Sequence, residues 1–232
     1  MPAQRLLLFD IDGTLVRAGE VGRAVFDRAI DMVLGYVPPG RVRMSGKTDP
    51  QIVREYLALA GLTRDDLVPL VLKQLERELA DAADELVTGG RPCPGAPELL
   101  AALSSDRRLH LSVLTGNIEP NAVVKLAAFG LHRWLDLEVG AYGSDSEDRR
   151  KLVPIALRRL RALRGTNLSG TDVWVVGDTP RDFDCAQAAG AHCLLVATGG
   201  FDADELGGLG ADAVLADLRS IEAVASLVTS GL

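Results

Sequence analysis

The chain has 232 residues, of which 47% are hydrophobic and 25% charged, which is typical of a compact α/β protein rather than a disordered or fibrous one. Its formal net charge of −7 argues against nucleic-acid binding, because affinity for a phosphate backbone needs a surplus of Lys and Arg on one face. Charged residues interrupt the apolar run 6–9 at once, so it is neither a signal peptide nor a membrane span of ~20 residues, and we expect a cytoplasmic protein. The cysteines form no CxxC pair, which predicts buried, reduced thiols at Cys93, Cys185 and Cys193.

Apolar runs in chain order predict a parallel sheet. Four of them are short and end at polar or glycine-containing turns, as buried strands do: residues 6–9, 110–114, 172–176 and 193–196. Weaker strands are expected at 137–139 and 213–215. Helical or loop segments follow the second, third and fourth runs, and this β-α-β alternation predicts an α/β fold with a Rossmann-like parallel sheet and helices on both faces.

The first strand is separated from the next unit, which begins at Pro92, by about 75 residues, too many for one crossover helix. Apolar residues recur there at helical spacing, and strand-like alternation is absent, in the segments 21–34, 51–60 and 67–83. We therefore expect a small all-α domain, residues 17–91, inserted into a core formed by residues 1–16 and 92–232. The two crossings, 16–19 and 88–94, are candidate hinges.

Two carboxylates close the first strand. Asp10 and Asp12 are two residues apart, so they point to the same side at the carboxyl end of the strand, where open α/β sheets bind ligands. Gly13 then lets the backbone turn sharply. Burying two acids where one would cap a turn is costly, so the pair favours a functional site over turn capping.

A hydroxyl, a glycine and an amide follow the second strand as Thr115, Gly116 and Asn117. They offer a donor side chain and accessible backbone N–H groups at a helix start, an environment typical of an oxyanion site. A plain helix cap made by Thr115 or Asn117 explains the same residues equally well.

The third strand also ends in an acidic loop. Asp178 lies at the strand end and Asp182 one helical turn later, so both can face the crevice near Asp10. Asp178 also suits a helix N-cap, with Pro180 just inside the helix, and the two roles are compatible.

The order of these motifs resembles the haloacid dehalogenase superfamily. Asp10-x-Asp12-Gly13-Thr14, Thr115, a basic residue near 150 and Gly177-Asp178-x-x-x-Asp182 follow one another as they do in that family, and the resemblance covers nearly the whole chain. It is strongest to phosphatases with a helical cap inserted after the first strand, such as the phosphoglycolate phosphatases. This implies a phosphoric monoester hydrolase whose cap domain is residues 17–91.

The resemblance also implies a role for each acid. Asp10 would attack phosphorus and form an aspartyl phosphate, while Asp12 would protonate the departing alkoxide and later take a proton from water. Mg²⁺ would be held by the carboxylates of Asp10 and Asp178 and the backbone carbonyl of Asp12, with Asp182 either as a further ligand or as a residue that supports the ligands from behind. Electrostatics predicts a cation at the site independently of the resemblance. Like charges ~4 Å apart repel by about 4 kcal/mol at an effective dielectric constant near 20, so clustered acids that face a phosphate need a divalent cation.

The remaining implied contacts hold the transferring phosphoryl group. Thr115 and the N–H groups of Gly116 and Asn117 would bind its oxygens, and a cation would balance its charge. The family's usual lysine, followed by proline, is missing; Glu147-Asp148-Arg149-Arg150-Lys151 stands in its place. Arg149, or else Lys151, is expected to take that role.

In the expected cap, Lys47 is a candidate contact to an anionic part of the substrate, because it lies in a polar, glycine-started loop between helices. A helix capped by Thr48 or Asp49, with Pro50 at its first position, explains the same segment without a ligand.

Two other functions stay open at this level. A phosphomutase would keep the fold and the nucleophile but pass the phosphoryl group to a sugar phosphate. A signalling module phosphorylated on Asp10 would need neither a lid nor the acid at Asp12. We expect a small phosphorylated metabolite as the partner, and the motifs specify neither its identity nor the oligomeric state.

Overall fold

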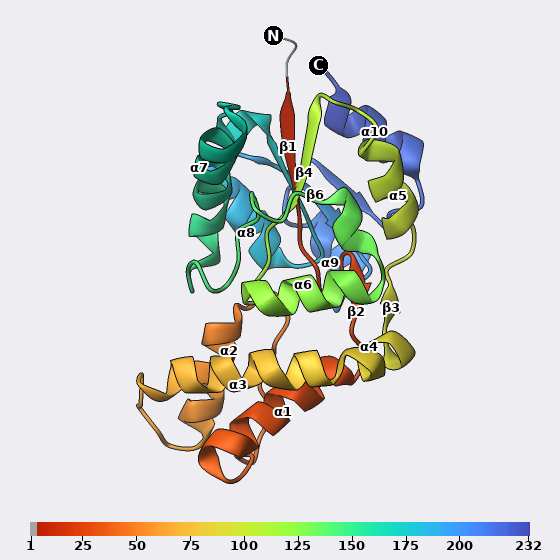
Figure 1. Cartoon of the computed structure of the whole chain (residues 1–232). Helices are drawn as coiled ribbons and strands as arrows, with labels where there is room; N and C mark the ends of the chain where they lie inside the picture. Colours follow the sequence, from red (N-terminus) through yellow and green to blue (C-terminus); the bar gives the residue numbers. More distant parts are fainter. Residues whose placement is uncertain (1–3) are drawn as a thin grey trace.

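A central sheet of five parallel strands organises the structure, a computed structural model that describes residues 4–232 (Figure 1). Its order is β4-β1-β5-β6-β7, with the bounds Leu109–Val113, Arg5–Phe9, Val173–Gly177, His192–Val196 and Ala213–Leu215. All four neighbouring pairs are parallel. Five of the six expected strands are confirmed to within one residue at each end; residues 1–3 of the expected core lie outside the described part.

Alternate residues of the strands pack on opposite faces of the sheet. Leu7 and Phe9 share a buried cluster with α5 (Ala96–Leu103) and α10 (Ile221–Thr229). Leu6 and Leu8 share another with α7 (Leu152–Arg164) and α8 (Pro180–Ala189). Figure 1 accordingly has α5 and α10 on one side of the sheet and α7 and α8 on the other. The three-layer α/β fold is therefore as expected, with apolar side chains on both faces of the strands.

Four helices follow the first strand and are called here the insert helices: α1 (Val21–Leu34), α2 (Asp49–Leu59), α3 (Leu67–Asp81) and α4 (Ala83–Gly89). They enclose an apolar cluster of their own, against which partly buried residues of α6 (Glu119–Ala128) also pack. In Figure 1 they lie beyond one end of the sheet, with α6 between them and the strands. The three helices expected from the sequence are present, and α4 adds a fourth.

The two segments that connect the insert helices to the core lie side by side. The short strands β2 (Val16–Arg17) and β3 (Arg91–Pro92) pair antiparallel, Val16 with Pro92 and Arg17 with Arg91. The two crossings expected from the sequence therefore lie side by side.

The strand expected at 137–139 is wrong, because these residues form a turn. The chain meets the edge of β4 at two separate points, where Asp136 N–H donates to Leu111 O at 2.7 Å and Ala141 N–H donates to Val113 O at 2.9 Å. Between them the Tyr142 hydroxyl donates to the carbonyl of Leu137 at 2.6 Å and fixes the turn. Val139 is thus buried, and Leu137 partly buried, by packing rather than by pairing in a ladder.

The cysteines are buried and unpaired, and burial raises the pKa of the Cys93 thiol to about 12, which keeps it unreactive. Between residues 4 and 232, no helix combines the length and the apolar character needed to cross a membrane.

The apolar cluster of the insert helices predicts the effect of core truncation there. Leu75 of α3 is fully buried, so Leu75→Ala should lower the free energy of unfolding by about 2–5 kcal/mol in urea denaturation. Leu70 of the same helix is 55% exposed, and Leu70→Ala should change it by less than ~0.5 kcal/mol. Equal losses in both variants would contradict the packing described.

Candidate active site

The site lies where β1, β4 and β5 end. Asp10 follows β1 directly and its N–H donates to Val176 O at 2.8 Å, while Asp178 follows β5 directly. Thr115 comes two residues after β4 and is held by a bond from its N–H to Ala141 O at 3.0 Å. All three line one cavity of about 630 Å³. The carboxyl end of the sheet therefore carries the site, as expected for this topology.

Three carboxylates gather on one side of this cavity. Oxygens of Asp10, Asp178 and Asp182 lie within 4.8 Å of one another, and all three residues are buried. Burial raises the pKa of Asp10 to about 6; the charge of Arg149 opposes this, and Asp182 and Asp12 add to it. Burial, followed by the charges of Asp182 and Asp10, also raises the pKa of Asp178 well above its ordinary value.

Arg149 is the cation of this cluster. One of its terminal nitrogens lies 3.2 Å from Asp10 Oδ1 and pairs with Asp182 Oδ1 as well, and its side chain is 6% exposed. Its buried Nε has no hydrogen-bond partner among residues 4–232, so the guanidinium keeps an unused donor. Lys151, the other cation expected from the sequence, is exposed and does not line the cavity.

Asp182 is fixed by its own helix start. Its Oδ2 accepts bonds from the N–H groups of Asp178 and Thr179, at 3.2 and 3.0 Å, and from the Thr179 hydroxyl at 2.7 Å. Thr179, rather than Asp178, is the residue preceding α8. Asp178 is instead held by the hydroxyl of Thr14, which donates to its Oδ1 at 3.2 Å.

The cluster fits a divalent cation. Three carboxylates face one guanidinium, so two negative charges are uncompensated, and carboxylate oxygens are the ligands that Mg²⁺ prefers. The turn after β1 makes room for this approach. Gly13 has φ +90°, and a Cβ there would lie 2.4 Å from Asp178 Oδ2, so only glycine permits both the turn and the contact.

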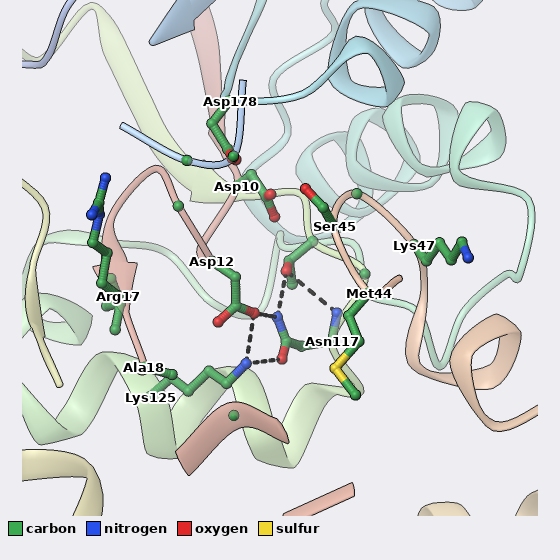
Figure 2. Close-up of a pocket in the computed structure, with 18 of the residues that line it drawn as sticks. Asp10, Asp12, Arg17, Ala18, Met44, Ser45, Lys47, Asn117, Lys125 and Asp178 are labelled. Carbon is green, nitrogen blue, oxygen red and sulfur yellow. Dashed lines mark hydrogen bonds and ion pairs between the residues drawn. The ribbon is translucent and has the colours of Figure 1, made fainter. Parts of the chain in front are cut away.

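The side chain of Asp12 faces away from the acid cluster. Its Oδ2 lies 2.6 Å from Lys125 Nζ and 2.7 Å from Asn117 Nδ2. Figure 2 marks both contacts with dashed lines. Asp12 still lines the same cavity, and 44% of its side chain is exposed. The expected metal contact through its backbone carbonyl stays a prediction.

Lys125 is a site residue that the motif analysis missed. It belongs to the buried face of α6, together with Asn121, Ala122 and Leu126. The signal available in the sequence was a lysine inside an apolar helical stripe, three residues after Ala122 and directly before Leu126, where a solvated charge is not expected.

The segment before α2 is packed onto the residues that follow β4. Asp49 N–H donates to Gly116 O at 2.7 Å, and its Oδ2 accepts from the N–H of Ile118 at 2.8 Å. A Cβ on Gly116 would lie 2.1 Å from the carbonyl oxygen of Lys47. Burial raises the pKa of Asp49 to about 7, opposed by the charge of Lys125. Asp49 thus caps the start of α6 from a distant part of the chain.

Lys47 and Thr48 have partners of their own. The Lys47 ammonium lies 2.6 Å from Glu55 Oε2, and in Figure 2 its side chain points away from Asp10, although the residue lines the cavity. Thr48 makes a capping box with Gln51 at the start of α2, which supports the helix-cap alternative for this residue. The substrate contact expected of Lys47 stays a prediction.

Comparison with known proteins identifies the family of this chain. The model of the haloacid dehalogenase-like hydrolases matches residues 7–187. A phosphoglycolate phosphatase of Rhodospirillum rubrum is 32% identical over 94% of this chain and 89% of its own. A plasmid-encoded phosphoglycolate phosphatase of Cupriavidus necator is 32% identical over 96% of this chain and 92% of its own.

Solved structures agree on the fold. A hydrolase from Pseudomonas syringae superposes with a TM-score of 0.73 at 20% identity, covering 98% of this chain and 100% of that one. CbbY from Rhodobacter sphaeroides in complex with phosphate gives 0.70 at 21% identity, covering 94% and 96%. The expected resemblance is confirmed: the chain belongs to the haloacid dehalogenase-like hydrolase family, among relatives that are phosphatases.

Proposed function

We propose that this enzyme is a Mg²⁺-dependent phosphatase that hydrolyses a small phosphomonoester through an aspartyl phosphate on Asp10. The observation that carries the proposal is the acid cluster at the carboxyl end of the sheet, where buried Asp10 shares one cavity with Arg149 and Thr115. The two phosphoglycolate phosphatases that match nearly the whole chain support the same reaction class.

The reaction has two displacements at phosphorus. First a carboxylate oxygen of Asp10 bonds to phosphorus, the bond to the ester oxygen breaks, and Asp12 gives its proton to the departing alkoxide. Then water attacks phosphorus and gives a proton to Asp12, and the bond between phosphorus and the Asp10 oxygen breaks to release inorganic phosphate. Splitting one hard displacement into two lowers the barrier of each.

The carboxylates of Asp10 and Asp178 and the backbone carbonyl of Asp12 are the groups proposed to hold the metal, with Asp182 beside them as a further or supporting group. When bound, Mg²⁺ would neutralise charge on the phosphate oxygens and on the acids around them. Asp182 already uses Oδ2 for backbone bonds and Oδ1 for Arg149, so its main contribution is to fix the guanidinium.

Two further residues are proposed to bind the phosphoryl group. Arg149 touches Asp10 Oδ1 and keeps an unused Nε donor, which suits an anion that arrives at the nucleophile. Thr115 is fully buried at the cavity wall, where its hydroxyl can donate to a phosphoryl oxygen. The N–H groups of Gly116 and Asn117 are candidates for the same oxygens; that of Asn117 also lies 3.3 Å from Thr115 Oγ1.

Residues 17–91, which contain the insert helices, are proposed to form a cap domain. The bonds from Asp49 to Gly116 and Ile118 would hold the cap against the core, and opening along β2 and β3 would admit substrate. A closed cap excludes water until the phosphoenzyme has formed. Lys47 is the candidate cap residue for an anionic group of the substrate.

The first test is a phosphate-release screen with Mg²⁺ against phosphoglycolate, sugar phosphates and nucleotides. Release from a small phosphomonoester supports the phosphatase, with phosphoglycolate the first candidate because of the curated relatives. Interconversion of sugar phosphate isomers without release would identify a phosphomutase instead. A phosphoenzyme that lasts for hours would favour the signalling module.

Replacing the nucleophile should abolish turnover. Asp10→Asn should lower kcat by more than about 10⁴-fold while substrate still binds, because the amide cannot form the acyl phosphate. The measurement is steady-state phosphate release, with binding followed by calorimetry. Asp31 is exposed on α1, and Asp31→Asn should keep full activity. An active Asp10→Asn enzyme is the result that would sink the covalent mechanism.

Metal binding should be visible without turnover. Saturating Mg²⁺ should raise the melting temperature by roughly 5–10 °C, since ligand at about 100 times its Kd contributes ~2.7 kcal/mol to the folded state. Asp178→Asn should remove most of that shift, whereas Asp204→Asn, at an exposed position of α9 (Ala203–Gly207), should retain it. A shift that survives in Asp178→Asn would place the ion elsewhere.

A further inference from the structure

Lys125 is a buried cation outside the cluster of Asp10, Asp178 and Asp182. Its side chain is 8% exposed on the inward face of α6. A buried ammonium is costly unless charged or polar groups surround it. Its partners are Asp12 Oδ2 and Asn117 Oδ1, both at 2.6 Å. The bond to Asp12, the proposed general acid and base, therefore offsets part of the cost of burying this charge.

The ammonium also fixes which way the Asn117 amide faces. Lys125 can only donate, so the Asn117 atom beside it must be the carbonyl oxygen. The amide nitrogen then points to the other side, where it donates to Asp12 Oδ2 at 2.7 Å and to Thr115 Oγ1 at 2.8 Å. Figure 2 shows the bonds among Lys125, Asn117 and Asp12 as a closed ring.

Two consequences follow for the reacting groups. Among residues 4–232, both hydrogen bonds to the Asp12 carboxylate end on Oδ2, and both come from donors that cannot accept a proton. A proton carried by Asp12 therefore has its place on Oδ1, on a side chain that is 44% exposed and lines the cavity. Thr115 Oγ1 accepts from the Asn117 side chain and backbone, so its own hydrogen is left to be donated elsewhere.

We propose that Lys125 is a positioning residue for proton transfer: through its bonds to Asp12 and Asn117 it presents Asp12 Oδ1 to the leaving-group oxygen and orients the Thr115 hydroxyl. This inference rests on the proposed function of Asp12. Lys125 also lines the cavity, and its proposed effect on the reacting ester passes through these two residues. The alternative is that Lys125 merely anchors α6 to the core.

The test uses leaving groups that differ in their need for a proton. Release of p-nitrophenolate proceeds without protonation, whereas an aliphatic alkoxide such as that of phosphoglycolate requires it, and kcat/KM reports the steps up to that departure. Lys125→Met should lower kcat/KM by roughly 10²-fold for phosphoglycolate and by less than about tenfold for p-nitrophenyl phosphate, mainly through kcat. Lys73→Met, which removes the same charge from an exposed position on α3, should change neither.

Asp12→Asn separates failure of this inference from failure of the proposed function. The proposed function fails if Asp12→Asn lowers kcat/KM equally for both substrates, or if the wild-type enzyme releases phosphate from neither. If Asp12→Asn loses activity mainly toward the aliphatic ester and Lys125→Met shows no such difference, the positioning role alone is overturned. Because Lys125 influences proton transfer through Asp12, the selectivity between the two substrates should be no greater in the double variant than in Asp12→Asn, and additive selectivities would contradict this.

A folding defect is controlled by two more variants. Lys125→Gln keeps a donor at a similar length and should show the same selectivity at a smaller magnitude if the methionine variant does not fold. Lys125→Arg keeps the charge and should recover part of the loss for the aliphatic ester. Melting temperatures that fall without any substrate selectivity would show an anchoring role only and overturn the proposal.

Discussion

Mutual repulsion among three buried carboxylates is the constraint that the rest of the site has to balance. Parallel pairing of β1 with β5 brings Asp10 and Asp178 to one edge, and α8 adds Asp182. Charges this close repel by about 4 kcal/mol per pair at an effective dielectric constant near 20. Hydrogen bonds from Thr14, Thr179 and the backbone offset only part of that cost. The cluster can therefore accommodate an added cation, and its buried acids are not arranged for maximal stability.

Arg149 shows how the balance is distributed over the chain. It comes from the short helical turn Arg149–Lys151 before α7, yet it reaches the carboxylates that follow β1 and begin α8. It also donates to the carbonyl of Gly46 at 3.3 Å, in the segment before α2. A planar guanidinium can serve several acceptors at once, which a lysine at this position could not do in the same way. Asp10, the rest of the acid cluster and the segment before α2 thus meet at one side chain.

Sequence patterns were sufficient for the fold because the strands are continuous apolar runs buried on both faces. They failed at 137–139, where Val139 is buried and Leu137 is partly buried in a turn that the Tyr142 hydroxyl stabilises, without strand pairing. Spacing could not separate Arg149 from Lys151, since both precede α7 and only packing turns one inward. Lys125 was missed because it belongs to no motif; it reaches Asp12 across more than a hundred residues of chain.

The contact between Gly116 and the backbone of Lys47 constrains how this enzyme can be re-engineered. The space for a side chain at Gly116 is taken by the path of a segment about 70 residues away in sequence, and Gly143 packs as closely, with a Cβ there only 2.0 Å from Gly116 O. A chimera that imports the insert helices of a relative must therefore import the matching residues at positions 116 and 143 too. The two regions are inherited jointly in such hybrids, and libraries that vary one of them in isolation will sample mostly misfitted interfaces.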